Sequence, residues 1–133
     1  MYLLDTNICI YLMKGTYPAL SRKILSIHPQ ELAVSAVTVY ELEYGAAKSG
    51  WQEKTRQNLR IFLSAFQVIP FAEEDAIAAG AIRAYLQKQG RPIGAYDLQI
   101  AAQGVARGFP VVTHNVAEFS RVPGIQMEDW TEA

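Results

Sequence analysis

The sequence has only one cysteine among its 133 residues, Cys9, and therefore cannot form an intrachain disulfide. A single cysteine is typical of a protein from a reducing compartment, and we expect Cys9 to be a small buried residue rather than a nucleophile. No apolar run approaches the roughly 18 residues that a membrane helix needs, and no basic segment precedes Asp5 as it would in a signal peptide. These absences predict a soluble, cytoplasmic protein.

The sequence also lacks an excess of charge of either sign. Its 12 basic and 13 acidic residues give a formal net charge of -1. Without an overall positive field the chain cannot hold a nucleic acid by bulk attraction, so any such contact must be local or must depend on a metal ion. Internal repeats, low-complexity tracts and linkers are absent as well, and the length fits one domain over residues 1–133.

Short β-branched runs alternate along the chain with longer stretches of helical period. This alternation predicts an α/β domain, with βα units around a mainly parallel central sheet of four to five strands. The expected strands are residues 2–4, 32–35, 67–69, 110–113 and 125–127. The expected helices are residues 7–14, 18–27, 37–49, 52–65, 73–89 and 95–107.

Asp5 is the most informative residue of the sequence. It ends the apolar run 2–4 and stands where a turn opens into the first expected helix. The carboxyl end of a buried strand is where α/β sheets bind their ligands. A carboxylate beside a buried sheet loses hydration and needs a partner that offsets the loss, and a divalent cation is such a partner.

Three further acids can meet Asp5. Glu41 is expected in the first turn of the third helix, and Asp97 in the first turn of the sixth helix. Glu118 lies just beyond the strand that ends at Thr113. A parallel sheet would bring these positions to one edge and place the four acids in one pocket.

Each acid also has a purely structural explanation. Asp5 suits the N-cap of the first helix, and Asp97 suits a first turn, where negative charge complements the helix dipole. Residues 38–41, TVYE, fit a capping box, and residues 115–118, NVAE, fit a looser version of it. The metal-site hypothesis therefore depends on the joint arrangement of the acids. The tyrosines near them, Tyr40, Tyr44 and Tyr96 among others, are expected to pack in the core or around the rim rather than to stack on bases.

Two other classes of function stay open. Phosphoryl-transfer domains of the phosphatase or receiver type also place an aspartate after the first strand. Phosphatases need a second acid two residues later, where this chain has Asn7, and receivers need a lysine after a late strand, whereas the last lysine here is Lys88. The second class is a non-catalytic binding module, in which the acids act only as helix caps.

The motifs 3–8 (LLDTNI), 38–42 (TVYEL), 92–102 (PIGAYDLQIAA) and 111–115 (VVTHN), with the ending 128–130 (EDW), occur in this order over nearly the whole chain. In this respect the sequence resembles the PIN-domain ribonucleases of the VapC toxin type. The resemblance implies a three-layer PIN-like domain with helices on both sides of the sheet.

The resemblance also implies a set of site residues. Asp5 and Asp97 match the acids that bind magnesium in this family, and Glu41 matches a third acid of the pocket. Many PIN domains carry an aspartate near the position of Asn115. This chain has a neutral amide there instead, and the nearest carboxylate is that of Glu118. The hydroxyls of two threonines are expected to orient the carboxylates, and these are Thr6 and Thr113.

The activity that the resemblance implies is metal-dependent cleavage of RNA. Magnesium prefers oxygen ligands and keeps several waters, so a few carboxylates are sufficient to bind it, and manganese is expected to substitute. The expected products carry 5′-phosphate and 3′-hydroxyl ends, and transfer RNA and ribosomal RNA are both candidate substrates. The expected partners are a cognate VapB-type antitoxin and a second copy of the chain in a homodimer, with promoter DNA bound only through the antitoxin.

Overall fold

The structure, a computed structural model, describes residues 1–50 and 53–132. Its strands are β1 (Tyr2–Leu4), β2 (Leu32–Ser35), β3 (Gln67–Ile69), β4 (Val111–Val112) and β5 (Met127–Glu128). Its α-helices are α1 (Thr6–Lys14), α2 (Pro18–Ser26), α3 (Ala36–Lys48), α4 (Glu53–Leu63), α5 (Glu73–Lys88), α6 (Ala95–Arg107) and α7 (Val116–Phe119). No helix of the described residues is long and apolar enough to cross a membrane.

The five strands form one parallel sheet in the order β3-β2-β1-β4-β5. β1 lies at its centre, where Leu4 pairs with Val34 of β2 and with Val112 of β4. The chain adds β2 and β3 on one side of β1 and then crosses to add β4 and β5 on the other. Ligand sites of open α/β sheets lie at such a reversal, outside the carboxyl ends of the strands. Asp5, the first residue after β1, lies there.

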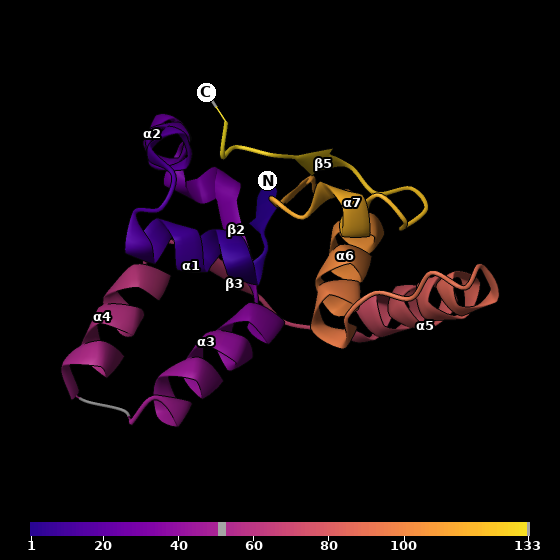
Figure 1. Cartoon of the computed structure of the whole chain (residues 1–133), viewed down its shortest axis with the longest axis horizontal. Coiled ribbons are helices and arrows are strands. Elements are labelled where there is room, and N and C mark those ends of the chain that lie inside the picture. The colour runs from indigo at the N-terminus through magenta and orange to yellow at the C-terminus, as the bar shows by residue number, and fades with distance from the viewer. Residues whose placement is uncertain (51–52, 133) are drawn as a thin grey trace.

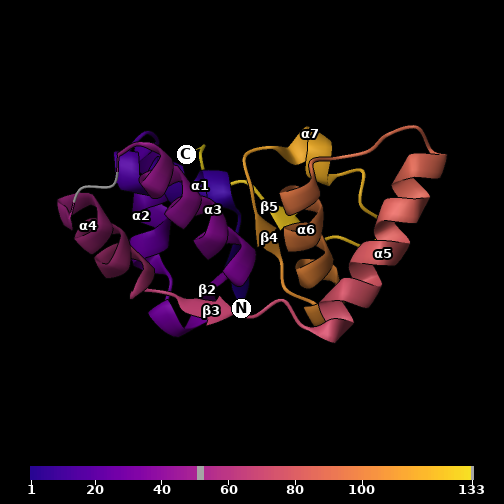
Figure 2. The same cartoon turned by 90° about the horizontal axis from the view of Figure 1, so that it is seen from below.

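Helices cover both faces of the sheet, as the predicted three-layer fold requires. α1, α2 and α4 lie on one side and α5 and α6 on the other, while α3 contacts both α4 and α6 (Figures 1 and 2). Successive side chains of β1 point to opposite faces of the sheet, because side chains alternate along a strand, and they therefore pack in different hydrophobic cores. Leu3 packs with Ala101 of α6, whereas Leu4 packs with Ile8 of α1.

Several predicted helix ends agree with the structure. The Asp5 side chain caps α1 by accepting a hydrogen bond of 2.8 Å from the Ile8 amide. α6 spans the predicted residues 95–107 and ends at Gly108, whose φ of 68° is the left-handed conformation that glycine adopts without strain. Cys9 is fully buried, as expected, and burial raises the pKa of its thiol.

The predicted capping box at residues 38–41 is wrong. α3 begins one residue before the predicted start, and its N-cap is Ser35, whose hydroxyl accepts a hydrogen bond of 3.0 Å from the Val37 amide. Thr38 is therefore inside the helix and fully buried. Glu41 lies beyond the first turn, where its carboxylate is free to make contacts outside α3.

Other boundaries also differ from the prediction. The fourth helix ends at Leu63 rather than at residue 65, and its predicted start at residue 52 lies outside the described residues. The last strand is residues 127–128 rather than 125–127, and a short helix, α7, was not predicted. The alternation of side chains along the sequence does not distinguish a strand of two residues from an extended loop. The ends of such a short strand are set by its pairing with a neighbouring strand.

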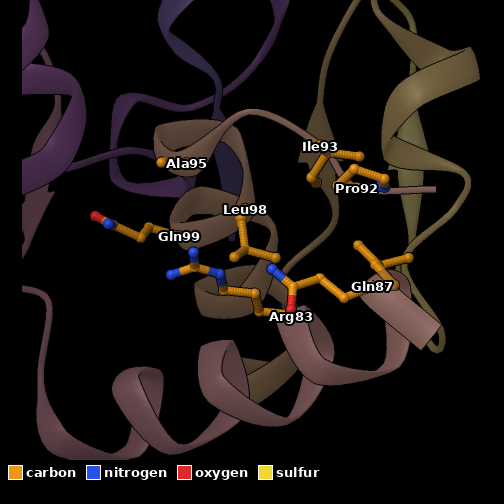
Figure 3. Close-up of a pocket in the computed structure, with 8 residues that line it drawn as sticks. Arg83, Gln87, Pro92, Ile93, Ala95, Leu98 and Gln99 are labelled. Carbon is orange, nitrogen blue, oxygen red and sulfur yellow. The ribbon is translucent and has the colours of Figure 1, made fainter. Parts of the chain in front are cut away.

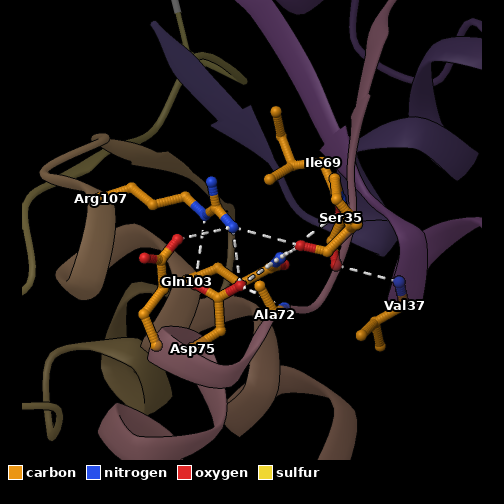
Figure 4. Close-up of polar contacts among 9 residues, drawn as sticks. Ser35, Val37, Ile69, Ala72, Asp75, Gln103 and Arg107 are labelled. Carbon is orange, nitrogen blue, oxygen red and sulfur yellow. Dashed lines mark hydrogen bonds and ion pairs between the residues drawn. The ribbon is translucent and has the colours of Figure 1, made fainter.

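The buried carboxylate of Asp75 joins α5 to α6. Asp75 lies in the first turn of α5, where it accepts a hydrogen bond of 2.8 Å from the Ala72 amide. It also forms an ion pair of 2.9 Å with the Arg107 guanidinium and lies 3.4 Å from the Gln103 amide (Figure 4). Although burial alone would raise the pKa of Asp75, the bonds to Arg107 and Ala72 hold it below its usual value. This network attaches the carboxyl end of α6 to α5, and Asp97 lies at the opposite, amino end of α6.

Candidate active site

Asp5 lies almost fully buried at the carboxyl end of β1, beside β4, with 2% of its surface exposed. Its backbone amide donates to the Val112 carbonyl at 3.1 Å, and its side chain is hydrogen-bonded to Thr113 and Ile8. Burial is the main reason that the pKa of Asp5 rises to about 6, and the negative charges of Glu41 and Asp129 contribute to this rise, while the hydrogen bonds to Thr113 and Ile8 oppose it. Asp5 thus caps α1, and it is also a buried acid whose charged form is destabilised.

Glu41 approaches Asp5 from α3 and is held there by Thr6. The Thr6 hydroxyl donates a hydrogen bond of 2.7 Å to Oε1 of Glu41 and lies 3.0 Å from the Thr38 hydroxyl. Thr6 directly follows Asp5, the N-cap of α1. The start of α1 therefore positions both Asp5 and, through Thr6, Glu41 of α3.

Asp97 enters the site from the first turn of α6, as predicted. Partial burial, together with the charges of Glu118, Asp5 and Glu41, raises the pKa of Asp97 to about 7. A methyl group added at Gly94, the N-cap of α6, would lie 3.8 Å from both Oδ2 of Asp97 and Oε1 of Glu118. The two carboxylates therefore face each other beside a residue with no side chain.

Glu118 is positioned by the residue that replaces the expected aspartate. The Asn115 side-chain amide donates to Oε2 of Glu118 at 2.9 Å, and the Gly94 amide donates to Oε1 at 3.1 Å. The Asn115 backbone amide in turn donates to the Thr113 hydroxyl at 3.0 Å. The pair at 115–118 is thus not a capping box, because Asn115 caps no backbone group of α7 with its side chain.

Asp129 is an acid of this neighbourhood that the sequence reasoning missed. Its charge contributes to the raised pKa of Asp5, and its own carboxylate lies 3.1 Å from Nδ1 of His114. Asp129 directly follows β5, just as Asp5 follows β1. The rule that found Asp5 would have found Asp129 too, but the predicted last strand ended one residue too early, at Met127 instead of Glu128.

The four acids share a negative charge that nearby cations do not neutralise. The ion pairs of the described residues involve other carboxylates, those of Glu31, Glu74, Asp75 and Asp129. Repulsion among the carboxylates contributes to the raised pKa values of Asp5 and Asp97, and a bound cation would remove this repulsion.

The donor set fits a hard divalent cation. Among residues 1–50 and 53–132, no three histidine, cysteine, aspartate or glutamate side chains are arranged to hold a metal ion on their own. Magnesium keeps several waters and commonly takes one or two protein carboxylates, so it does not need such a triplet. Asp5 and Asp97 supply that number of carboxylates, and neighbouring acids remain to bind the waters.

A hollow lies between α5 and α6, and none of the four acids lines it (Figure 3). Arg83 and Gln87 of α5 face Leu98 of α6 across it, with Ile93 of the preceding turn at its end. No carboxylate lines this hollow. It offers none of the donors that metal-assisted chemistry needs.

Comparison with known proteins identifies relatives over the whole domain. The family described as PIN domain matches residues 2–125. A tRNA(fMet)-specific endonuclease VapC from Salmonella typhimurium is 40% identical over 129 residues, which are 97% of each chain. The crystal structure of DNA-bound VapBC from Salmonella typhimurium has a chain with a TM-score of 0.91 and 38% identity, and the match covers 97% of both chains. VapBC2 from Rickettsia felis, bound to a DNA fragment from its promoter, gives a TM-score of 0.88 and 32% identity over 97% of this chain and 98% of that one.

Proposed function

The chain belongs to the PIN-domain family, and from this premise we propose that it is a magnesium-dependent endoribonuclease of the VapC toxin type. The observation that carries the proposal is the meeting of Asp5, Glu41, Asp97 and Glu118, from four separate elements, beside the switch point of the sheet. The names of relatives such as the tRNA(fMet)-specific endonuclease support RNA as the substrate.

Asp5 and Asp97 are proposed to hold the metal ion. When bound, magnesium would polarise the scissile phosphodiester and lower the pKa of an attacking water. Asp5 is fixed by the Ile8 amide and the Thr113 hydroxyl, so little side-chain freedom remains to be lost when it binds an ion. Thr113 accordingly has the role of orienting the Asp5 carboxylate.

Glu41 and Glu118 are proposed to handle protons and water around the reacting phosphate. Thr6 anchors one carboxylate oxygen of Glu41, and both oxygens of Glu118 accept hydrogen bonds, one from the Gly94 amide and one from the Asn115 side chain. Anchored carboxylates can accept a proton from an attacking water in a fixed direction. Attack in line with the departing 3′-oxygen would leave 5′-phosphate and 3′-hydroxyl ends, as the family resemblance implies.

The proposed substrate is transfer RNA. Both transfer RNA and ribosomal RNA expose unpaired loops whose phosphates an open pocket can reach. The 40% identity to a tRNA(fMet)-specific endonuclease makes initiator transfer RNA the first substrate to test. Because this substrate is cytoplasmic, we place the activity in the cytoplasm.

The test is cleavage of an initiator tRNA transcript by the purified chain, with an elongator tRNA and ribosomal RNA alongside. Cleavage should stop with a chelator and return with magnesium or manganese. Asp97→Asn should abolish it, whereas Glu73→Gln, which removes an exposed acid of α5, should not. Cleavage by Asp97→Asn at the wild-type rate, or cleavage in the chelator, would overturn the proposal and favour a non-catalytic binding module.

The proposed partners are an antitoxin that covers the acid pocket and a second copy of the chain in a homodimer. The solved structures from Rickettsia felis and Salmonella typhimurium named above are VapBC complexes, and both are bound to DNA. We propose that promoter DNA is reached only through the antitoxin, because the net charge of -1 provides no basic surface. Expression of this chain alone should arrest growth, and co-expression of its antitoxin should restore it.

A further inference from the structure

Three tyrosines are exposed beside the acid pocket. Tyr40 has 54% of its surface exposed, Tyr44 58% and Tyr96 41%. Of the two places expected for these side chains, the core and the rim, the structure shows the rim. Exposed aromatic rings cost free energy in water unless something covers them, so a cluster of three calls for a ligand.

The three rings and Glu41 line a single hollow of about 410 Å³. This size falls within the range of roughly 300 to 1,000 Å³ that small-molecule sites have. Tyr40 and Tyr44 are one helical turn apart and share a face of α3, while Tyr96 comes from α6. The hollow therefore spans two elements, and its walls combine ring faces with phenol hydroxyls.

Tyr40 and Tyr96 hold each other in place. Their hydroxyls are 3.2 Å apart, and their ring centroids are 5.4 Å apart with an interplanar angle of 63°. Two rings fixed in this way lose little further freedom when a flat group stacks on them.

The hollow is continuous with the catalytic acids. Tyr40 directly precedes Glu41, and Tyr96 directly precedes Asp97. Glu41 itself belongs to both places, because it lines the hollow and accepts the hydrogen bond from Thr6. A group bound among the tyrosines thus lies next to the phosphate that the acids act on.

Resting on the proposed function, we propose that this tyrosine hollow binds an unpaired nucleobase of the nucleotide adjacent to the scissile phosphate. The net charge of -1 provides no long-range attraction for an RNA backbone, so local contacts besides the proposed metal ion have to contribute to affinity. Stacking of a base on aromatic rings provides such a contact, and it requires a base outside a duplex. The hollow thereby restricts cleavage to single-stranded loops.

The first test measures cleavage of the initiator tRNA transcript by variants of Tyr40 and Tyr96. Leucine keeps the apolar bulk but removes the π face, and we expect each Tyr→Leu variant to lower kcat/KM by about 5- to 150-fold, mainly through KM. Tyr→Phe keeps the ring and should stay much closer to wild type. Tyr85→Leu, on α5 with a similar exposure of 47%, is the matched control and should change nothing.

The second test measures binding without catalysis. RNA carrying 5-iodouridine in its loop, irradiated with the Asp5→Asn variant in a chelator, should crosslink to peptides that contain Tyr40, Tyr44 or Tyr96. Crosslinks confined to other segments, or Tyr→Leu variants that cleave normally while wild type is active, would overturn the inference alone. Failure of the wild-type chain to cleave any RNA would overturn the proposed function as well.

Two other occupants give distinct results. If a second copy covers the hollow, Tyr→Leu variants will change the mass measured by light scattering, and this overturns the inference. If an antitoxin side chain fills it, the variants will lose antitoxin affinity while cleaving free RNA normally, with the same consequence. Retained mass and retained antitoxin affinity, together with the loss in kcat/KM, support the nucleobase.

Discussion

The hydroxyl of Thr6 donates a hydrogen bond of 2.7 Å to the carboxylate of Glu41, across 35 positions of the chain. Thr6 directly follows Asp5, so a single turn of backbone controls the direction of two acids. Glu41 therefore depends on the start of α1 as much as on its own helix.

Replacement of Thr6 tests whether this bond matters for activity. Thr6→Val keeps the branched shape but cannot donate, and we expect RNA cleavage to fall by roughly 10-fold or more, as for other groups that orient metal-site carboxylates. Thr6→Ser retains the hydroxyl and should restore most of the rate. Equal rates for the two variants would show that the hydroxyl has no part in positioning Glu41. Urea denaturation of both variants separates this effect from a loss of stability.

Substitution of Asp5 separates its two roles. Asparagine caps helices about as well as aspartate does, so at about pH 4, where the Asp5 carboxyl of the folded state is protonated, Asp5→Asn should leave the unfolding free energy of the metal-free protein within about 1 kcal/mol. At about pH 7 the variant should be the more stable protein, because it carries no buried charge at this position. The same variant should lose more than about 100-fold in cleavage, because it removes a charge from the proposed metal site. Asp5→Ala loses the cap as well and should be less stable than Asp5→Asn by about 1 kcal/mol. An active Asp5→Asn protein would leave Asp5 with its structural role alone.

The raised pKa values predict a pH dependence of stability. Burial and neighbouring acids raise the pKa of Asp5 to about 6 and that of Asp97 to about 7, from 3.8. The folded state therefore holds these protons more tightly than the unfolded state does. Without metal, the free energy of unfolding should fall as the pH rises from about 4 to about 7, and then level off.

Denaturation in urea with a chelator, over a series of pH values, measures this dependence. Asp97→Asn should flatten the upper part of the curve, because it removes the group with a pKa of about 7. Magnesium should bind more tightly at about pH 7.5 than at about pH 5.5, since its ligands must lose their protons. A wild-type curve that rises between about pH 5 and about pH 7 would contradict the assignment.

The ion pair between Asp75 and Arg107 is expected to dominate the attachment of α5 to α6. Asp75 is fully buried, and Arg107→Met would leave its charge without a cation, at a cost of roughly 3 kcal/mol. Glu74 contacts the same guanidinium but is 64% exposed, so Glu74→Gln should cost less than about 1 kcal/mol. Thermal or urea denaturation compares the two variants, and equal losses would show that burial of Asp75 is not what makes the pair strong.

The sequence by itself determined those features that depend on neighbouring residues. The ends of α1 and α6 follow from a capping side chain at Asp5 and from a glycine at Gly108, both of which act within one helical turn. The order of strands and helices follows from local periodicity. The motifs around Asp5 and Asp97 were enough to indicate the family.

Only the tertiary structure decided which distant residues meet. Glu41 is directed by Thr6 from another element, Glu118 is held by the Gly94 amide, and Asp75 is buried against Arg107. Each of these contacts joins residues that lie more than a helical turn apart along the chain. Local propensity does not contain this information, because the contacts arise from the order in which strands enter the sheet and from the packing of helices on its two faces.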